Sequence, residues 1–196
     1  NGDNDFWTGS VAHGFDISSQ HYHVSVVYDD LTRGGSYLFT SESVAGGYIN
    51  FDSEILIVNP SHLGFDGPST SALSMNDNGQ GVLGLISILD GVDIVAGTCN
   101  PPTSNITCNK TPLFKLTNDW GETWQGDPLA YNFYYVPDEV YDDILSHWPT
   151  VDVDQCTEEQ FEITDFWSWF EFDMRVDQEG DPHIVMSMVA ESDDYF

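Results

Sequence analysis

The chain has 196 residues, of which 33 are acidic and only four are lysine or arginine, so its formal net charge is −29. Such a charge repels nucleic-acid phosphates and anionic lipid headgroups, because binding either one needs clustered basic side chains. We therefore expect no nucleic-acid partner and no direct membrane insertion. The acidic residues are spread between apolar segments, and a hydrophobic content of 40% with 14% aromatic residues is enough for a packed core.

Apolar segments separated by Gly-, Asn-, Asp- and Ser-rich stretches predict strands along most of the chain. They span residues 22–28, 36–39, 54–58, 82–89, 112–116, 167–174 and 183–189. Along residues 167–176 the side chains alternate, with Trp169, Glu171, Asp173 and Arg175 on one face, which is typical of a half-buried strand. Only Pro137–Leu145 predicts a helix, and Asp138 or its neighbour is its expected N-cap. The predicted class is all-β with one short helical insertion.

Three segments share one plan, a polar turn followed by an apolar run: residues 16–27, 74–88 and 176–189. The runs begin near residues 24, 82 and 184, so the intervals exceed the roughly 40 to 50 residues of a propeller blade. We expect approximate repeat units at 1–60, 61–130 and 131–196, with insertion loops at 91–111 and 138–162.

The sequence Thr117-Asn118-Asp119-Trp120-Gly121-Glu122-Thr123-Trp124 predicts a tight turn between two strands. Asp119 can accept backbone N–H groups and Gly121 can adopt a positive φ. Thr117 and Thr123 can hydrogen-bond locally, and Trp124 can bury its ring beneath the hairpin.

This spelling, Ser/Thr-x-Asp-x-Gly-x-Thr-Trp, resembles the Asp-box (BNR repeat) of sialidase-like β-propellers. The alternative is a coincidental hairpin turn. The resemblance implies a partial β-propeller of about three to four blades within a larger secreted protein, with the Asp-box residues Thr117, Asp119, Gly121, Thr123 and Trp124 in a structural role away from a catalytic centre. The acidic, repetitive style also resembles large secreted Bacteroidetes-like proteins that are cargo of the type IX secretion system.

Sialidases of this fold hold the substrate carboxylate with three arginines, but this chain has only Arg33 and Arg175. The resemblance therefore supports the scaffold and not intact sialidase chemistry, and we predict no catalytic residue. A carboxylate pair can cleave a glycosidic bond without arginine, yet 33 acidic residues offer no basis for choosing one. For His21, His23 and His183 we favour a strand residue bonded to a neighbouring turn over a catalytic role.

Oxygen-rich turns suit Ca²⁺, and Asp177, Glu179 and Asp181 alternate within one Gly-containing loop. A solvated acidic face is the simpler explanation of these carboxylates. Cys99 and Cys108 bracket a Pro-rich loop, so a disulfide between them is expected, in keeping with an extracellular setting. Cys156 is left over.

Aromatic residues offer rings that can stack on sugars, with core packing as the alternative: Tyr131, Phe133, Tyr134, Tyr135, Trp148, Trp167 and Trp169. The sequence thus favours a non-catalytic interaction or adhesion module of a secreted or cell-surface protein, with glycan, Ca²⁺ or other surface proteins as candidate ligands. The alternatives are a glycoside hydrolase whose catalytic residues lie outside this fragment, and a cargo or structural subunit of a bacterial surface complex.

Overall fold

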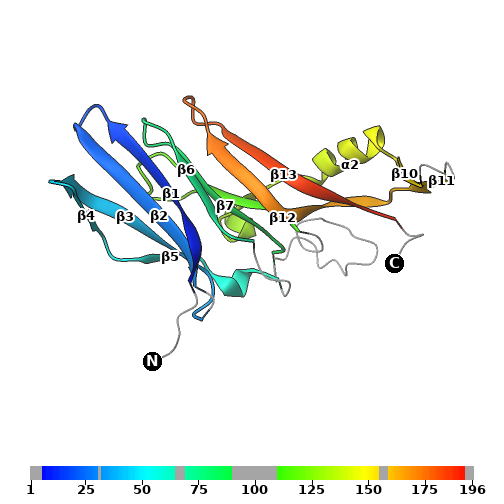
Figure 1. Ribbon diagram of the computed structural model, residues 1–196, viewed down its shortest axis with the longest axis horizontal. Helices are drawn as coiled ribbons and strands as arrows, with labels where there is room; N and C mark the ends of the chain where they lie inside the picture. Colours follow the sequence, from blue (N-terminus) through cyan, green and yellow to red (C-terminus); the bar gives the residue numbers. More distant parts are fainter. Residues whose placement is uncertain (1–5, 31, 65–68, 90–109, 155–158, 193–196) are drawn as a thin grey trace.

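The computed structural model describes residues 6–30, 32–64, 69–89, 110–154 and 159–192 (Figure 1). The chain is mostly β-strand and forms several antiparallel sheets with one α-helix, as the sequence predicts for the all-β class. Three of the sheets follow one another in chain order and account for most of the fold.

The first sheet comprises β1 to β5: β1 Phe6–Asp16, β2 His21–Asp30, β3 Ser36–Ala45, β4 Tyr48–Phe51 and β5 Ile55–Val58. Strands β1 to β4 pair in sequence order, and β5 also pairs with β3. Ser25, Val27 and Leu38 point to one face and are buried. Their neighbours Val26, Tyr28 and Phe39 are only partly buried on the other face, which follows from the two-residue period of a strand.

The second sheet is a meander of four strands: β6 Ala72–Met75, β7 Gly81–Ser87, β8 Thr111–Thr117 and β9 Tyr134–Tyr135. Every residue of β7 is buried: Leu83 and Leu85 belong to the main core cluster on one face, and Gly84 packs against Met174 on the other. Its continuous apolar sequence reflects that position.

The third sheet is the hairpin of β12 Asp165–Val176 and β13 Pro182–Glu191. Phe166, Ser168 and Met174 are buried on the face toward the second sheet, whereas Trp169 and Arg175 are exposed on the opposite face. This alternation is the one that the sequence predicts for residues 167–176.

In chain order, helix α2 (Asp138–His147) and a small hairpin of β10 (Thr150–Asp154) and β11 (Glu159–Glu162) follow the second sheet and precede the third. The helix is where the sequence places it. Pro137, the neighbour of Asp138, occupies the N-cap position and makes no side-chain hydrogen bond. Asp138 and Glu139 lie in the first turn, where the helix dipole favours acidic side chains. The buried Tyr141 hydroxyl bonds Thr111 (2.9 Å) and Ser168 (3.1 Å), and so ties the helix to both sheets.

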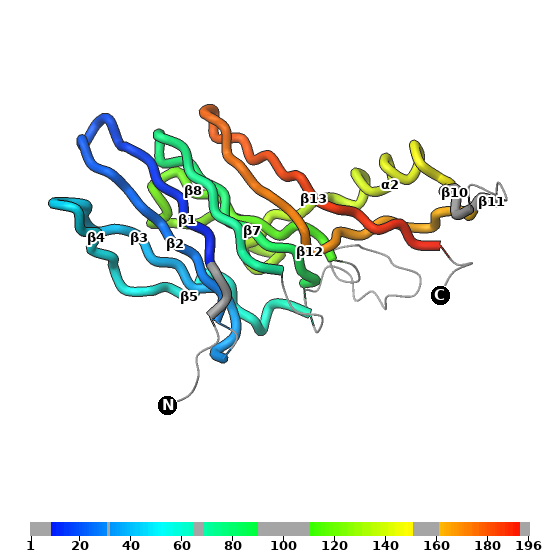
Figure 2. The backbone as a smooth tube through the Cα atoms, viewed as in Figure 1, coloured from blue at the N-terminus to red at the C-terminus, as the bar shows by residue number. Residues whose placement is uncertain are grey.

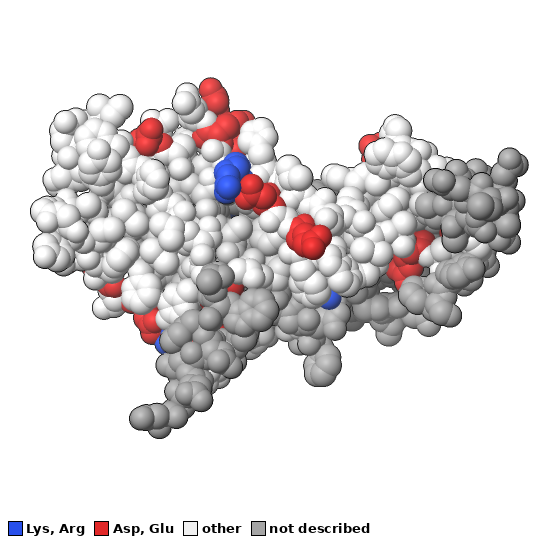
Figure 3. Space-filling model, in the orientation of Figure 1, with Lys and Arg blue, Asp and Glu red and all other residues white. Residues whose placement is uncertain are grey.

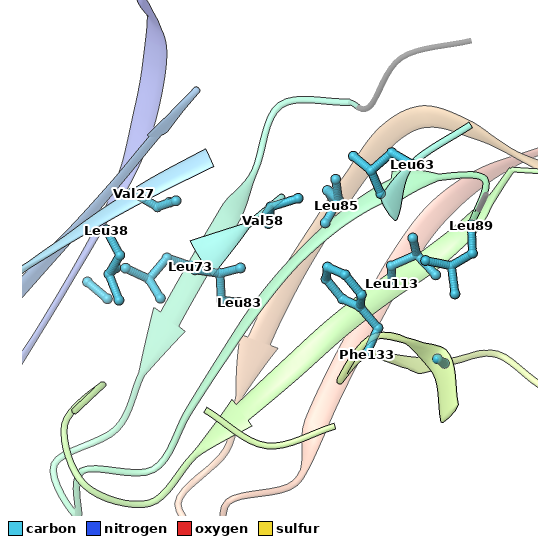
Figure 4. Close-up of a cluster of buried hydrophobic side chains, with 12 residues drawn as sticks. Val27, Leu38, Val58, Leu63, Leu73, Leu83, Leu85, Leu89, Leu113 and Phe133 are labelled. Carbon is cyan, nitrogen blue, oxygen red and sulfur yellow. The ribbon is translucent and has the colours of Figure 1, made fainter. Parts of the chain in front are cut away.

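The three large sheets lie side by side, with β6 beside β1 and β12 beside both β6 and β7 (Figures 1 and 2). The main core fills the space between the first two sheets and beneath β8, where Val27, Leu38, Leu73, Leu83 and Phe133 are at most 2% exposed (Figure 4). Sheets two and three approach closely at Gly84: a Cβ there would lie 2.4 Å from the Met174 sulfur. Most of the predicted 91–111 insertion, with Cys99 and Cys108, lies outside the described residues, and so does Cys156.

Candidate functional site

Three hairpin turns lie at one edge of the molecule, one from each large sheet (Figure 1). Each begins with an Asp or Asn whose side-chain oxygen accepts the N–H two residues ahead. The pairs are Asp16 with Ser18 (2.7 Å), Asn76 with Asn78 (2.9 Å) and Asp177 with Glu179 (3.0 Å). The three similar segments of the sequence therefore occupy equivalent places, as the first hairpin of each sheet.

Side-chain amides join neighbouring turns. Asn76, Asn78 and Gln80 donate to the backbone carbonyls of Asp177 (2.7 Å), Gln178 (3.1 Å) and Glu179 (3.2 Å). On the other side, Asp77 accepts the Phe15 N–H at 3.1 Å. The polar turn residues thus fix each sheet against the next, a role that their sequence pattern alone does not reveal.

Residues 117–124 form a closed turn after β8, centred on Asp119. The Asp119 carboxylate accepts from the Thr117 hydroxyl (2.7 Å), the Thr123 N–H (2.8 Å) and the Thr123 hydroxyl (2.5 Å). Burial raises the pKa of Asp119, but these hydrogen bonds outweigh it and the pKa lies below its usual value. Gly121 has a φ of 90°, and the Trp124 indole donates to its carbonyl at 3.0 Å.

The 117–124 turn also contacts the first two hairpins. The Trp120 N–H donates to the Gly79 carbonyl at 3.0 Å, and the Trp120 ring stacks on His23 with centroids 4.3 Å apart. Burial lowers the pKa of His23, so this ring is less readily charged than a free histidine. His183 bonds Asp177 in the third turn (2.9 Å), which is the kind of role predicted for these histidines.

The expected calcium loop is held by its own hydrogen bonds. Asp177 accepts from the Glu179 and Asp181 N–H groups and pairs with His183, whose contact lowers the pKa of Asp177 most. No group of three His, Cys, Asp or Glu side chains in the described part of the chain is arranged to hold a metal ion. Bound Ca²⁺ at Asp177, Glu179 and Asp181 stays a prediction.

The two arginines are engaged separately. Arg33 pairs with Asp30 and with Glu54 (2.5 Å), and its guanidinium lies over the Tyr37 ring at 3.8 Å. Arg175 pairs with Asp173 on β12, in a different sheet (3.0 Å). They cannot jointly clamp a ligand carboxylate.

The aromatic residues considered for sugar stacking are dispersed. Phe133 is 1% exposed in the core, and Tyr131 stacks on His62. Trp148 (63% exposed) follows helix α2. Trp169 (40% exposed) lies on the outer face of β12 and contacts Trp167, with ring centroids 5.1 Å apart. The candidate aromatic residues therefore do not all share one surface.

A concave region lies where β1, β6 and β12 meet. Among the described strands, β1 pairs only with β2, β6 only with β7, and β12 only with β13, so each has one free edge. Two contacts link their free edges: the Ser10 hydroxyl donates to the Leu73 carbonyl (3.2 Å), and the Val176 N–H donates to Ser74 (3.2 Å). The resulting space of about 450 Å³, here called the inner groove, is lined by Gly9, Ser10, Thr70, Ser71, Ala72, Phe170, Glu171 and Phe172.

Irregular pairing shapes the inner groove on both sides. The register of β1 shifts between Trp7 and Ser10, and that of β12 shifts between Ser168 and Phe172. Such bulges redirect side chains and are common beside functional sites. The sequence analysis did not predict this groove. Gly9 is the residue that could have indicated it, because a Cβ at this position would collide with the Val27 carbonyl.

No family model, curated protein or solved structure matches the chain. Within the described residues, no helix is long and apolar enough to span a membrane.

Proposed function

We propose that this chain is part of a sialidase-like β-propeller that serves as a non-catalytic interaction or adhesion module of a secreted or cell-surface protein. One observation carries the proposal: three consecutive antiparallel sheets lie side by side, and the first strand of each, β1, β6 and β12, meets the others at the inner groove. Blades of a propeller are arranged in this way around a channel. The 117–124 turn, with its Asp-box spelling, supports the same scaffold.

The use of the carboxylates supports a non-catalytic role. Buried Asp29 accepts the N–H and hydroxyl of Ser71 (3.0 and 2.8 Å), which joins the first two sheets. Asp30 and Glu54 are paired with Arg33. These three groups hold the fold together. The lining of the inner groove contains one carboxylate, that of Glu171, whereas a glycosidase of the common type needs a pair.

The inner groove is the best candidate for ligand binding. Its lining offers the exposed Thr70 hydroxyl, the rings of Phe170 and Phe172, and the Glu171 carboxylate. The hydroxyls of Ser10 and Ser71 also line it, but they already donate to the Leu73 carbonyl and to Asp29. Rings and hydrogen-bonding groups together suit a sugar, and a carboxylate without lysine or arginine in the lining disfavours an anionic one. We propose a neutral glycan as the ligand.

The surface charge agrees with an extracellular setting. On the face in Figure 3, acidic side chains form scattered patches, a basic patch lies among those nearest the middle of the view, and most of the remaining described surface carries neither charge. A highly charged, solvated surface keeps a protein soluble and discourages self-association.

The test is calorimetric titration with neutral cello-, xylo- and manno-oligosaccharides, with sialyllactose as the anionic counterpart. We expect a neutral oligosaccharide to bind and sialyllactose not to bind. Glu171→Ala and Phe172→Ala should each weaken binding at least tenfold, whereas Glu139→Ala on helix α2 should leave it unchanged. Absence of binding to every neutral sugar, or binding that is indifferent to both groove variants, would refute the ligand assignment.

A further inference from the structure

Strand β13 has a long free edge on the side of the third sheet away from β6 (Figure 1). Among the described strands it pairs only with β12, so alternate backbone N–H and C=O groups point away from its partner. The other sheet edges are shorter or irregular: β4 and β5 have four residues each and β9 has two, and register shifts interrupt β1 and β12. β13 has ten residues.

The sequence of β13 does not protect this edge. Natural edge strands are usually blocked by lysine, proline or a bulge, which prevent pairing with another strand. Residues 184–190 contain no charged residue, no proline and no glycine. The register shift of the third sheet lies between Ser168 and Phe172 on β12, while their partners Met188 and Met186 are only two residues apart, so β13 itself stays regular.

The first two sheets show what this edge lacks. In their equivalent hairpins the second strand, β2 or β7, also pairs with a third antiparallel strand, β3 or β8. Val27 on β2 and Leu85 on β7 lie beside those third strands and are fully buried. On β13, Ile184 and Met186 are only partly buried, and Val185 on the opposite face is 74% exposed. A third strand beside β13 would cover these side chains.

The charges around the edge indicate the chemistry of that strand. Glu179 and Asp181 precede the uncharged segment and Glu191 follows it, and none of the described lysines or arginines pairs with them. A second copy of β13 fits poorly: in an antiparallel pair centred on Met186, Asp181 of one copy would face Glu191 of the other, and like charges directly opposite are destabilising. The net charge of −29 also favours a basic partner over a second copy.

We propose that the free edge of β13 binds an extended basic peptide segment of another polypeptide, which adds to the third sheet as an antiparallel strand. In strand addition the backbone hydrogen bonds give affinity and alternate side chains give specificity. Apolar side chains at every second position of the peptide lie beside Ile184, Met186 and Met188. Basic side chains at its ends meet Asp181 and Glu191. This site is separate from the inner groove, which lies at the opposite edge of β12.

The experiment titrates the chain into a fluorescent peptide with capped ends, Lys-Val-Thr-Leu-Thr-Val-Thr-Val-Lys, and follows anisotropy. At about 3.3 Å per residue this peptide spans most of β13. An ionic strength of about 0.15 M limits general attraction to the acidic surface, because charges are then screened over about 8 Å. We expect binding, and at least tenfold weaker binding of Lys-Thr-Thr-Thr-Val-Val-Leu-Val-Lys and of the alternating peptide with glutamate ends. Absence of binding, or equal binding of either control peptide, would overturn the proposal.

A matched pair of protein variants locates the site. Val185→Lys places a charge at the centre of the β13 edge, and Val11→Lys makes the same change at a 59% exposed position on β1. Val185→Lys should weaken peptide binding at least tenfold and Val11→Lys by less than twofold, with native circular dichroism spectra for both. Equal weakening would mean general charge attraction and would overturn the proposal. Neither variant should change sugar binding at the inner groove, so the two proposals can fail separately.

The backbone contact has its own signature. Alternate N–H groups of a strand point to the same neighbour, so of two peptides N-methylated at odd or at even positions, one should keep its affinity and the other should lose it. Equal affinity of the two would contradict strand addition. Sedimentation of the chain alone tests the other occupant: a dimer that Val185→Lys dissociates would assign the edge to a second copy and overturn the proposal.

Discussion

Removing the Asp119 carboxylate should measurably destabilise the protein, because this group closes the 117–124 turn. The side chain accepts three hydrogen bonds, two from Thr123 and one from Thr117. At about 1 kcal/mol net for each bond, reduced for partial exposure, Asp119→Ala should lower the free energy of unfolding by about 2–3 kcal/mol. Asp119→Asn keeps one acceptor oxygen and should lose about half as much.

The assay is urea unfolding followed by tryptophan fluorescence. Asp52→Ala provides the control, since Asp52 is exposed and should change stability by less than about 0.5 kcal/mol. If Asp119→Ala behaved like Asp52→Ala, the turn would not contribute to the scaffold as argued.

Three further predictions concern the contacts between and within sheets. Met174→Ala should lower the free energy of unfolding by about 2–4 kcal/mol in urea titrations, because the Met174 side chain is fully buried against Gly84. Asn76→Asp keeps the acceptor oxygen of the turn but loses the amide that donates to Asp177, so it should lower the free energy of unfolding by about 1–2 kcal/mol. The control Asn118→Asp changes an exposed residue and should have little effect. Equal effects of the two substitutions would contradict the proposed link between turns. Hydrogen bonds from the Arg33 backbone and guanidinium lower the folded-state pKa of Asp30. The ionised Asp30 carboxylate therefore stabilises the fold fully above about pH 4, and this stabilisation is lost as the pH falls further. In thermal melts between pH 4 and pH 2, Asp30→Asn should lose less stability than the wild type.

The strands with regular patterns were predictable from the sequence. In β12 the alternation of residues 167–176 matches the observed burial, and the polar turns of the three similar segments mark the first hairpin of each sheet. These features are local, because side-chain period and turn chemistry act over a few residues.

Strand β1 was not predicted, because its buried face carries the small residues Ser10, Ala12 and Gly14. Close packing requires them: a Cβ on Gly14 would lie 2.5 Å from the Trp120 ring. The inner groove depends on register shifts in two strands far apart in sequence, which only the tertiary pairing sets. The sequence offers Asp177 as a candidate cation ligand or as part of a solvated acidic face, but it does not show the bonds that Asp177 makes to the Asp181 N–H and to His183.

The propeller arrangement is tested most directly by an experimental structure of the natural full-length polypeptide, by crystallography or cryo-electron microscopy. The account predicts that further antiparallel sheets continue the series on the outer faces of the first and third sheets, around an axis beside β1, β6 and β12. A structure in which those faces are covered by helices or left in solvent, with no ring of sheets, would contradict it.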